Sequence, residues 1–509
     1  MSDNSANNKR IAKNTIFLYF RMLIKMLVSL YTSRIVLEYL GITDYGIYNV
    51  VGGIVTLFGF IVGPMTISVQ RFLSYELGKK TKSQETINTI FSMAIFIHII
   101  LSIIICIIAE TIGLSIFHTL QIPSERIDAA KWVLQISIIS SCFTVLQIPY
   151  TGLIVAYEKM DAYAYISIIE VFLKLLIVFL LPIIPHDALI TYAILVLITT
   201  VIVQFLYIIY CKTKIKDVQI KRKWDKKMFK DLSSFASWSM LGEIAWSATN
   251  QGVNIILGNF FSPVVNAARG ITVQILTALN QFVYNFQTAM NPQIIKYYAA
   301  KDISSMNNLT LQGIKFSYFL MFAISLPFLF NIELILSIWL KTVPEYTAIF
   351  CRLAIIGVLC DTLSNLFATV VKASGKIKYY QITLSLCLFL NLPLSYIFLY
   401  LNFSPSVVYI IYIGVSITII FIRLFFIQRI CGLKILTYIT NVSIPVIITT
   451  FFALIIPTIL YYINITNTLL GTLSNFLICF ISPCLSILFV GLTKNERNTI
   501  LLKAHLIKR

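Results

Sequence analysis

The amino-acid sequence predicts an all-α polytopic membrane protein, and three observations lead to this prediction. Hydrophobic residues make up 58% of the 509-residue chain and charged residues only 12%, well below the charged share of soluble domains. Apolar segments long enough to span a bilayer recur from end to end, which leaves no room for a soluble domain. Basic residues are abundant in every second connection between these segments, as in multi-pass membrane proteins.

The apolar segments predict about fourteen transmembrane helices. The stretch 331–345 is apolar but short, so we interpret it as a re-entrant or interfacial piece. No removable signal peptide is expected, because the first ten residues are polar and carry Lys9 and Arg10. The predicted helices are 12–38, 46–72, 87–110, 130–157, 161–182, 187–211, 232–257, 264–291, 311–331, 346–371, 379–401, 405–428, 438–462 and 468–492.

The alternation of basic loops predicts that both termini are cytoplasmic. Lys and Arg gather at both ends of the chain and after helices 2, 6 and 10, whereas the alternate connections, which follow the odd-numbered helices, carry almost none beyond Arg126, Lys131 and Lys341. We assign the net charge of +19 to topology rather than to nucleic-acid binding. The connection 212–231 has nine basic residues. We interpret it as an ordinary cytoplasmic linker, with a lipid-headgroup or partner site as the alternative.

The two halves of the chain resemble each other. Leu40-Gly41 recurs as Leu257-Gly258, and at the same offset Ala156, Lys159 and Tyr163 recur as Ala373, Lys376 and Tyr380. A repeat of six helices keeps the same membrane orientation and suits alternating access between paired bundles. The predicted organisation is a lobe of six helices at 1–211, a basic linker at 212–231, a second six-helix lobe at 232–430, and two extra helices with a basic tail at 431–509.

Three segments carry a resemblance to a known family. They are Lys13-Asn14-Thr15, the run Leu40-Gly41-Ile42-Thr43-Asp44-Tyr45-Gly46-Ile47-Tyr48, and the repeated Ala…Lys turns near residues 156 and 373. The chain resembles the polysaccharide-biosynthesis branch (Wzx-type flippases) of the multidrug/oligosaccharidyl-lipid/polysaccharide exporter superfamily. The resemblance implies twelve core helices in two lobes, with extra C-terminal helices in some members.

The same resemblance implies a function, a place and partners. It implies a flippase that moves a polyprenyl-diphosphate-linked oligosaccharide, such as an O-antigen unit of lipopolysaccharide or another surface polysaccharide, across the bacterial inner membrane. Partners would be the lipid bilayer, the lipid-linked glycan and polysaccharide polymerases, with no nucleic acid. No cofactor is expected beyond coupling to H⁺ or Na⁺.

Cations within the predicted spans indicate a site for an anion. Arg21 and Lys25 lie four residues apart on one face of the first helix, where two like charges cannot satisfy each other. Arg269 lies on the eighth helix. Guanidinium groups bind phosphate in a bidentate manner, so we predict a cationic cleft formed by these three residues. The alternative for Arg21 and Lys25 is that they extend to the headgroups.

Polar side chains at helical spacing predict further lining of a cleft, because amides suit sugar hydroxyls. The alternative is close packing of the second helix and an interhelical hydrogen-bond network between helices 7 and 8. The candidates are Asn49, Gln70, Asn250, Asn280, Gln281 and Asn285.

Acidic residues within spans are candidates for coupling to H⁺ or Na⁺. Glu170 and Lys174 are four apart and are expected to pair. Glu243 and Asp361 have no opposite charge nearby in sequence, so they could couple an ion or could pair with Arg269 or Arg352.

Other classes of protein fit less well. The nine cysteines and four histidines show no metal or disulfide spacing, and no phosphate-binding loop or nucleophile elbow is present, so neither an enzyme nor a metal site is expected. A cation-coupled multidrug exporter is disfavoured by the basic residues, and a membrane glycan polymerase by the short outer loops. A flippase for the peptidoglycan lipid precursor stays open, because it would also need a cationic cleft.

Overall fold

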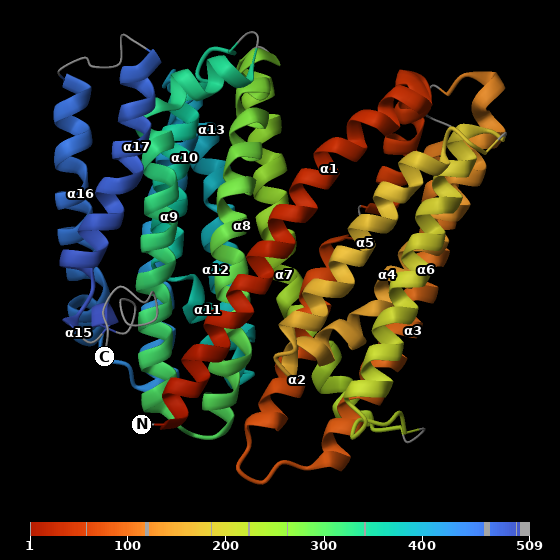
Figure 1. The fold of residues 1–509 in the computed structure, drawn as a ribbon, viewed down its shortest axis with the longest axis horizontal. Coiled ribbons are helices and arrows are strands. Elements are labelled where there is room, and N and C mark those ends of the chain that lie inside the picture. The colour runs from red at the N-terminus through yellow and green to blue at the C-terminus, as the bar shows by residue number, and fades with distance from the viewer. Residues whose placement is uncertain are drawn as a thin grey trace. The chain divides into compact units, whose positions relative to one another are not determined.

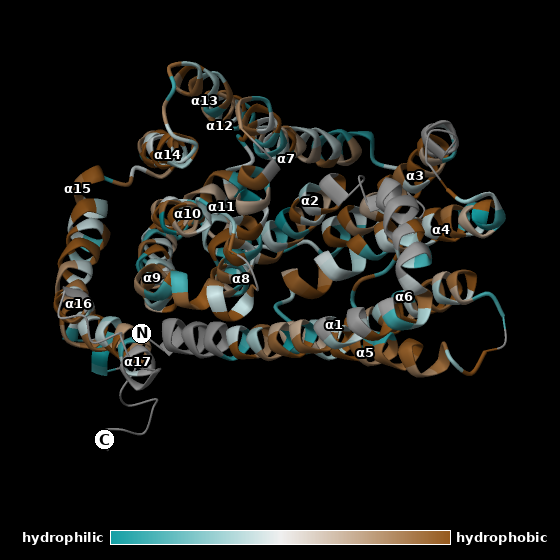
Figure 2. Cartoon of the chain, turned by 90° about the horizontal axis from the view of Figure 1, so that it is seen from above, coloured by the Kyte–Doolittle hydropathy of each residue, from teal (hydrophilic) through white to brown (hydrophobic). Residues whose placement is uncertain are grey.

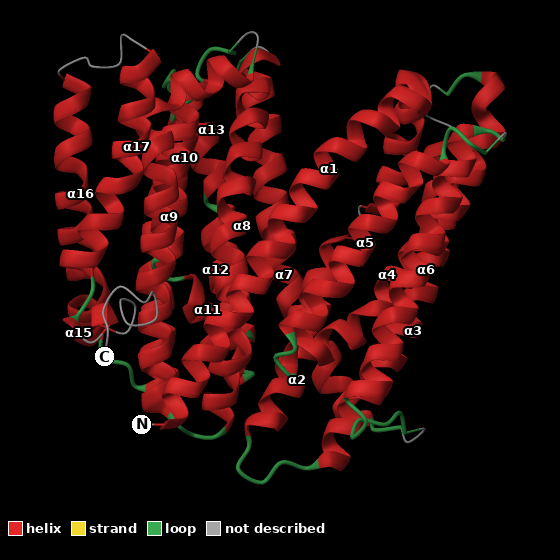
Figure 3. Cartoon of the chain, viewed as in Figure 1, coloured by secondary structure: helices red, strands yellow, loops and turns green. Residues whose placement is uncertain are grey.

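The structure is a computed structural model that describes residues 2–56, 59–117, 122–184, 186–221, 224–261, 263–340, 343–462, 469–494 and 496–498. All regular structure in these residues is helical (Figures 1 and 3). The chain divides into two compact units, residues 1–243 and 244–509. The division falls within one helix, α7 (Lys226–Phe260), close to the predicted basic linker.

The first unit is built around α4, which packs against α2, α3 and α6, while α1 packs along α5. A buried cluster that includes Leu73, Ile90 and Tyr207 joins α2, α3, α4, α5 and α6 with the start of α7. The helices are α1 (Ser2–Thr56), α2 (Gly59–Gly78), α3 (Gln84–Phe117), α4 (Ile127–Ala156), α5 (Met160–Leu180) and α6 (Ala188–Lys214), with a short 3-10 turn η1 (Ser124–Arg126) before α4.

A sharp kink divides α1 at Gly41, as the predicted turn between helices 1 and 2 requires. Gly41 has φ of +71°, a conformation that costs glycine little and other residues much more. Asn14 donates from Nδ2 to the backbone carbonyl of Glu158 in the α4–α5 turn at 3.4 Å. Two segments that carry the family resemblance therefore meet in space.

The second unit packs α8 against α9, α10 and α11, with α14 on the far side of α10. After the end of α7, the helices of this unit are α8 (Pro263–Ala299), α9 (Ile303–Trp339), α10 (Thr347–Thr362), α11 (Asn365–Ser374), α12 (Lys378–Phe389), α13 (Asn391–Tyr400), α14 (Val407–Cys431), α15 (Ile435–Tyr438), α16 (Ile444–Tyr462) and α17 (Leu469–Ser486). Two π-helical turns, η2 (Ile439–Ser443) and η4 (Ile487–Gly491), flank the last two long helices.

The two extra C-terminal helices dock on α9. Asn475 of α17 donates to Asn331 Oδ1 at 3.1 Å, where α9 kinks after Pro327. Asn331 in turn donates to the carbonyl of Pro327 at 3.1 Å. Nearer the start of α9, Lys315 forms an ion pair of 2.7 Å with Glu496, which follows α17 and η4. Polar contacts therefore fix this addition at two levels of α9.

Three predicted details change. The segment 331–345 is not a separate re-entrant piece, because α9 continues past its kink at Asn331 as far as Trp339. Predicted helix 10 is broken into α10 and α11 after Thr362. Predicted helix 11 is broken into α12 and α13 at Leu390, where Asn391 donates to the carbonyl of Leu388.

Ten helices of the described residues are long and apolar enough to cross a membrane. They correspond to predicted helices 3–6 and 9–14, and α16 illustrates their hydrophobic colouring in Figure 2. Predicted helices 1, 2, 7 and 8 lie on α1, α2, α7 and α8, which are long but more polar. These are the first two predicted helices of each half. The protein is a multi-pass membrane protein.

Candidate functional site

The cations predicted on the first helix lie where α1 packs along α5 in the first unit. The Arg21 guanidinium sits 4.4 Å from the ring centroid of Tyr163 on α5. The ring of Tyr163 is 6.5 Å from that of Tyr207 on α6, which is fully buried. Two tyrosines from two helices thus form an aromatic backing for Arg21, which fixes its position by a cation–π contact.

The Arg21 guanidinium is not fully satisfied by the protein. Its Nε is buried and has no hydrogen-bond partner in the structure. A buried donor without an acceptor costs about 1–3 kcal/mol, and more when it carries charge. The protein therefore leaves one donor of this charged group without an acceptor.

Lys25 lies one helical turn further along α1 and belongs to the same cluster. Its ammonium group interacts electrostatically with Glu170, Arg21 and Lys174. Glu170 forms the predicted ion pair with Lys174 on α5, at 2.5 Å from Oε1 to Nζ. The sequence predicted this pair but placed no carboxylate near Lys25, because Glu170 is distant in sequence.

We define the cationic cluster as Arg21, Lys25, Glu170 and Lys174. Three cations share one carboxylate that pairs directly with Lys174, so the cluster carries excess positive charge on α1 and on α5, and α5 is one of the ten candidate spans. Such charge is costly away from water unless an anion or a hydrated cavity accompanies it. The arrangement suits a ligand with several acidic oxygens, which could engage the Arg21 fork and an ammonium group together.

Arg269 has a different environment in the second unit. Its side chain is 6% exposed. Nε donates to Asn254 Oδ1 at 2.5 Å, and one terminal nitrogen donates to Asn250 O and Oδ1 at 3.1 and 3.3 Å. The Tyr409 ring centroid is 5.8 Å away. This is an interhelical network between α7 and α8, the alternative left open by the sequence.

The remaining predicted polar residues take several positions. Asn285 is buried, with Nδ2 lacking a hydrogen-bond partner, and Gln70 is likewise buried with Nε2 lacking one. On α8, Asn280 is half-buried and Gln281 is exposed. The side chain of Asn49 lies outside the described residues. Asn250 is engaged by Arg269, whereas the other four described amides remain predictions as lining residues.

The two candidate coupling acids differ in their surroundings. Glu243 is exposed on α7. Asp361 ends α10 at the break before α11 and accepts a hydrogen bond from the hydroxyl of Tyr412 on α14. Neither pairs with Arg352, which binds Glu333 at 2.6 Å. Arg423 lies near Asp361 and donates to Asn365 Oδ1 at 2.7 Å and Ser364 Oγ at 2.9 Å.

One charged cluster was not found from the sequence. Arg126 bridges Asp44, in the turn after Gly41, and Asp187, which caps α6. Burial opposes ionisation of Asp187, but hydrogen bonds from Arg126, Ile190 and Leu189 outweigh it and hold the pKa of this carboxyl below its ordinary value. The available signal was Arg126 itself, a basic residue in a connection that the alternation of basic loops predicts to be external, where Lys and Arg are otherwise almost absent.

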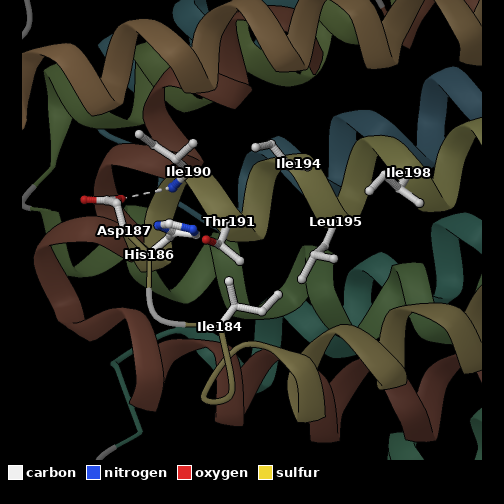
Figure 4. Close-up of a pocket in the computed structure, with 8 residues that line it drawn as sticks. All are labelled: Ile184, His186, Asp187, Ile190, Thr191, Ile194, Leu195 and Ile198. Carbon is white, nitrogen blue, oxygen red and sulfur yellow. Dashed lines mark hydrogen bonds between the residues drawn. The ribbon is translucent and has the colours of Figure 1, made fainter.

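A shallow apolar groove lies beside this cluster. Ile190, Ile194 and Ile198 line one side of α6, and His186 and Asp187 lie at its polar end (Figure 4). Its position on the surface of a spanning helix suits hydrocarbon rather than a polar substrate. Among the described residues no group of three or more His, Cys, Asp or Glu side chains could hold a metal ion.

Comparison with known proteins adds two family matches. Residues 11–298 match the model of the family described as polysaccharide biosynthesis protein. Residues 239–397 match the MatE model. No curated protein sequence matches the chain.

Solved structures share the fold at low sequence identity. An outward-facing multidrug resistance MATE family transporter of the MOP superfamily aligns with a TM-score of 0.71 and 14% identity, covering 84% of this chain and 97% of the other. MATE in the bent conformation gives 0.70 and 15%, with 83% and 96% covered. A MOP superfamily transporter from Pyrococcus furiosus, described as having reversed pocket polarity that suggests a different function, gives 0.68 and 14%, with 83% and 96% covered.

Proposed function

Because this chain belongs to the polysaccharide biosynthesis protein family, we propose that it is a flippase for a polyprenyl-diphosphate-linked oligosaccharide. It would carry the glycan and the diphosphate across the bacterial inner membrane by alternating access, with both termini in the cytoplasm. The polyprenyl tail would stay in lipid. The glycan would serve a surface polysaccharide such as O-antigen.

The observation that carries the proposal is the cationic cluster on α1 and α5. A diphosphate presents negative charge and many acceptor oxygens to a site that holds a buried donor without an acceptor, Arg21 Nε. Arg21 would bind phosphate oxygens through its fork while Lys25 supplies a mobile point charge. Glu170, paired with Lys174, would keep the cluster from binding the anion too tightly to release it.

The same observation disfavours a multidrug exporter for cationic compounds, although the fold is that of MATE transporters. Excess positive charge repels a cationic drug, and the like-charge contact would cost affinity. The Pyrococcus furiosus transporter, whose pocket polarity is described as reversed, shows that this fold accommodates more than one pocket polarity.

Coupling would reside in the second unit. Asp361 ends a half-helix at the α10–α11 break, and half-helix ends with buried carboxylates are suited to H⁺ or Na⁺. Its hydrogen bond with Tyr412 would break and re-form as the carboxylate takes up or releases the cation. Glu243 is exposed and is the weaker of the two candidates.

The proposal is tested by deleting the gene in its host and measuring the polyprenyl-linked glycan in each leaflet of the inner membrane. We expect completed units to accumulate on the cytoplasmic leaflet and the surface polymer to be lost. Wild type and the control Lys80→Gln, an exposed loop residue, should restore the polymer. Arg21→Ala and Lys25→Ala should not, at equal protein levels.

Two results would contradict the proposal. If lipid-linked units still reach the outer leaflet in the deletion strain, the chain transports something else. If the peptidoglycan precursor accumulates instead of the surface-polysaccharide unit, the cationic cluster keeps its role and the substrate assignment is wrong.

A further inference from the structure

The basic connection between α6 and α7 is a docked segment rather than a free loop. Its backbone follows α3: Gln84 Nε2 donates to the Asp217 carbonyl at 2.5 Å, and Gln219 N donates to Asn88 Oδ1 at 3.0 Å. Lys221 N donates to Ser92 Oγ at 2.8 Å. We call residues 215–221 and 224–225 the docked linker.

The α3 residues that hold the docked linker form one stripe. Gln84, Asn88, Ser92 and Phe96 are spaced four apart, so they lie on one face of the helix. Phe96 continues the stripe with an aromatic contact, its ring centroid 4.7 Å from that of Trp224. The linker is therefore fixed along the first three turns of a membrane-spanning helix (Gln84–Thr111).

The docked linker presents apolar groups at a defined height on the membrane surface. Trp224 is 50% exposed and Ile220 is 53% exposed, and Phe96 beside them is 39% exposed within its span. Tryptophan prefers the level of the lipid headgroups, where one part of its ring is apolar and another can donate a hydrogen bond. Trp224 thus marks the bilayer interface on the side that the basic loops assign to the cytoplasm.

Positive charge surrounds this aromatic contact. Seven described lysines in and beside the docked linker are all exposed, against three aspartates, of which Asp225 is engaged in capping the start of α7 through the amide of Met228. The lysines are Lys212, Lys214, Lys216, Lys221, Lys226, Lys227 and Lys230. Because α3 holds the backbone at Asp217, Gln219 and Lys221, the lysines of the docked linker extend from a fixed backbone that is close in sequence to Trp224.

We propose that the docked linker and the adjoining start of α7 form a binding site for the phosphate-bearing headgroup of anionic phospholipids. The ammonium groups of Lys221 and Lys226 contact the phosphate, while Trp224, Ile220 and Phe96 contact the upper part of the acyl chains. Polybasic segments near a membrane attract anionic lipids by about 1 kcal/mol for each Lys or Arg, or roughly fivefold in affinity. The inference does not depend on the transported substrate.

The test uses quenching of tryptophan fluorescence by brominated lipids in nanodiscs that contain the full chain. Brominated phosphatidylglycerol and brominated phosphatidylcholine are compared at equal mole fraction. Wild type should be quenched more by the anionic lipid, and Trp224→Phe should abolish the difference. The double variant Lys221→Gln/Lys226→Gln should need a higher anionic fraction for the same quenching, by at least fivefold.

Two controls separate this site from charge alone. Lys376→Gln/Lys378→Gln removes the same charge from exposed positions in another basic loop. This variant should keep the difference in quenching between the anionic and the neutral lipid. Asn88→Ala/Ser92→Ala changes no charge but removes two acceptors of the linker amides, and it should weaken the preference. Thermal unfolding of each variant checks that the fold is kept.

The proposal is overturned if both lipids quench Trp224 equally, or if the control loop variant loses the preference as fully as the linker variant. A further arm identifies the source of the phosphate. Millimolar inorganic phosphate is added in a low-salt buffer, and a control buffer without phosphate has the same ionic strength. If phosphate removes the preference for the anionic lipid, the site takes a soluble anion and not a lipid. Retention of the preference supports the lipid headgroup.

Discussion

Arg21 and Arg269 are alike in sequence and different in structure. Both lie on predicted helices of the opening pair of their respective halves, and both lie near a tyrosine ring. The donors of Arg269 are taken up by Asn250 and Asn254, whereas Arg21 has a buried Nε without a partner and another cation one turn away. One arginine joins helices, and the other keeps a donor without an acceptor in the protein.

The difference teaches how a cation within a membrane can be assigned. Both are arginines on one of the more polar helices, and their partners distinguish them. A guanidinium whose donors are met by amides stabilises helix packing, while one among like charges requires a further anion. We therefore propose the substrate-contacting role for Arg21, and the prediction that Arg269 also binds substrate is what the second experiment below tests.

The largest effect is expected from the cationic cluster. Arg21→Ala/Lys25→Ala should reduce transport by on the order of 100-fold, because two charge-assisted contacts of about 1.5–3 kcal/mol each would be lost. Thermal stability should change little, since neither residue bridges helices by a hydrogen bond to a partner that would be left buried. Initial rates in proteoliposomes measure the loss, and a stability loss equal to that of Arg269→Ala would remove the distinction between the two arginines.

Arg269→Ala should act on stability instead. It leaves amide oxygens of Asn250 and Asn254 without donors in a buried network, which should lower the free energy of unfolding by about 2 kcal/mol. Chemical unfolding in detergent micelles measures this loss. Transport per folded molecule should stay within a few-fold of wild type, and a 100-fold loss there would assign Arg269 to the substrate as well.

A smaller effect is expected at Glu170. Glu170→Gln removes the one carboxylate of the cationic cluster and leaves three cations, so a diphosphate lipid should bind more tightly, by roughly tenfold. Release should become slower and the transport rate should fall. Equilibrium binding and initial transport rates are measured together, because binding should become tighter while the rate falls. Weaker binding would show that Glu170 supports the site only by positioning Lys174.

The smallest effect concerns acid stability at Arg126. Asp187 has a pKa below its ordinary value of 3.8, so its ion pair stabilises the folded chain above that pH, and the contribution is lost as the pH falls through the lower folded-state pKa. Asp187→Asn keeps a side chain that can cap α6 but removes the charge. Below about pH 4 its melting temperature should approach that of wild type, and a constant gap at all pH values would contradict the ion-pair explanation.

The fold was largely predictable because it depends on local patterns. Apolar segments, alternating basic loops and the Leu40-Gly41 turn indicated the helices, and Glu170 with Lys174 was recognisable because the two are one turn apart on α5. Contacts between distant segments carried no such signal. Three such contacts join residues that only packing brings together. They are Arg126 with Asp44 and Asp187, Tyr412 with Asp361, and Glu170 near Lys25.

Helix breaks were also hard to predict from hydropathy. The segment 346–371 is apolar enough on average to be predicted as one helix, yet it breaks after Thr362, where Arg423 of α14 donates to Ser364 and Asn365. The kink of α9 depends on Pro327 together with Asn475 from a helix far along the chain. In both cases a tertiary partner compensates the broken helix, and hydropathy alone records only that the segment is apolar.

The most direct test of the central claim is transport by purified protein. Proteoliposomes would carry a polyprenyl-diphosphate-linked oligosaccharide in one leaflet, and its appearance in the other would be followed for wild type, Arg21→Ala and Arg269→Lys. We predict movement by wild type and by Arg269→Lys, with Arg21→Ala reduced by at least tenfold. Equal rates for wild type and Arg21→Ala, or no movement by wild type above protein-free vesicles, would contradict the account.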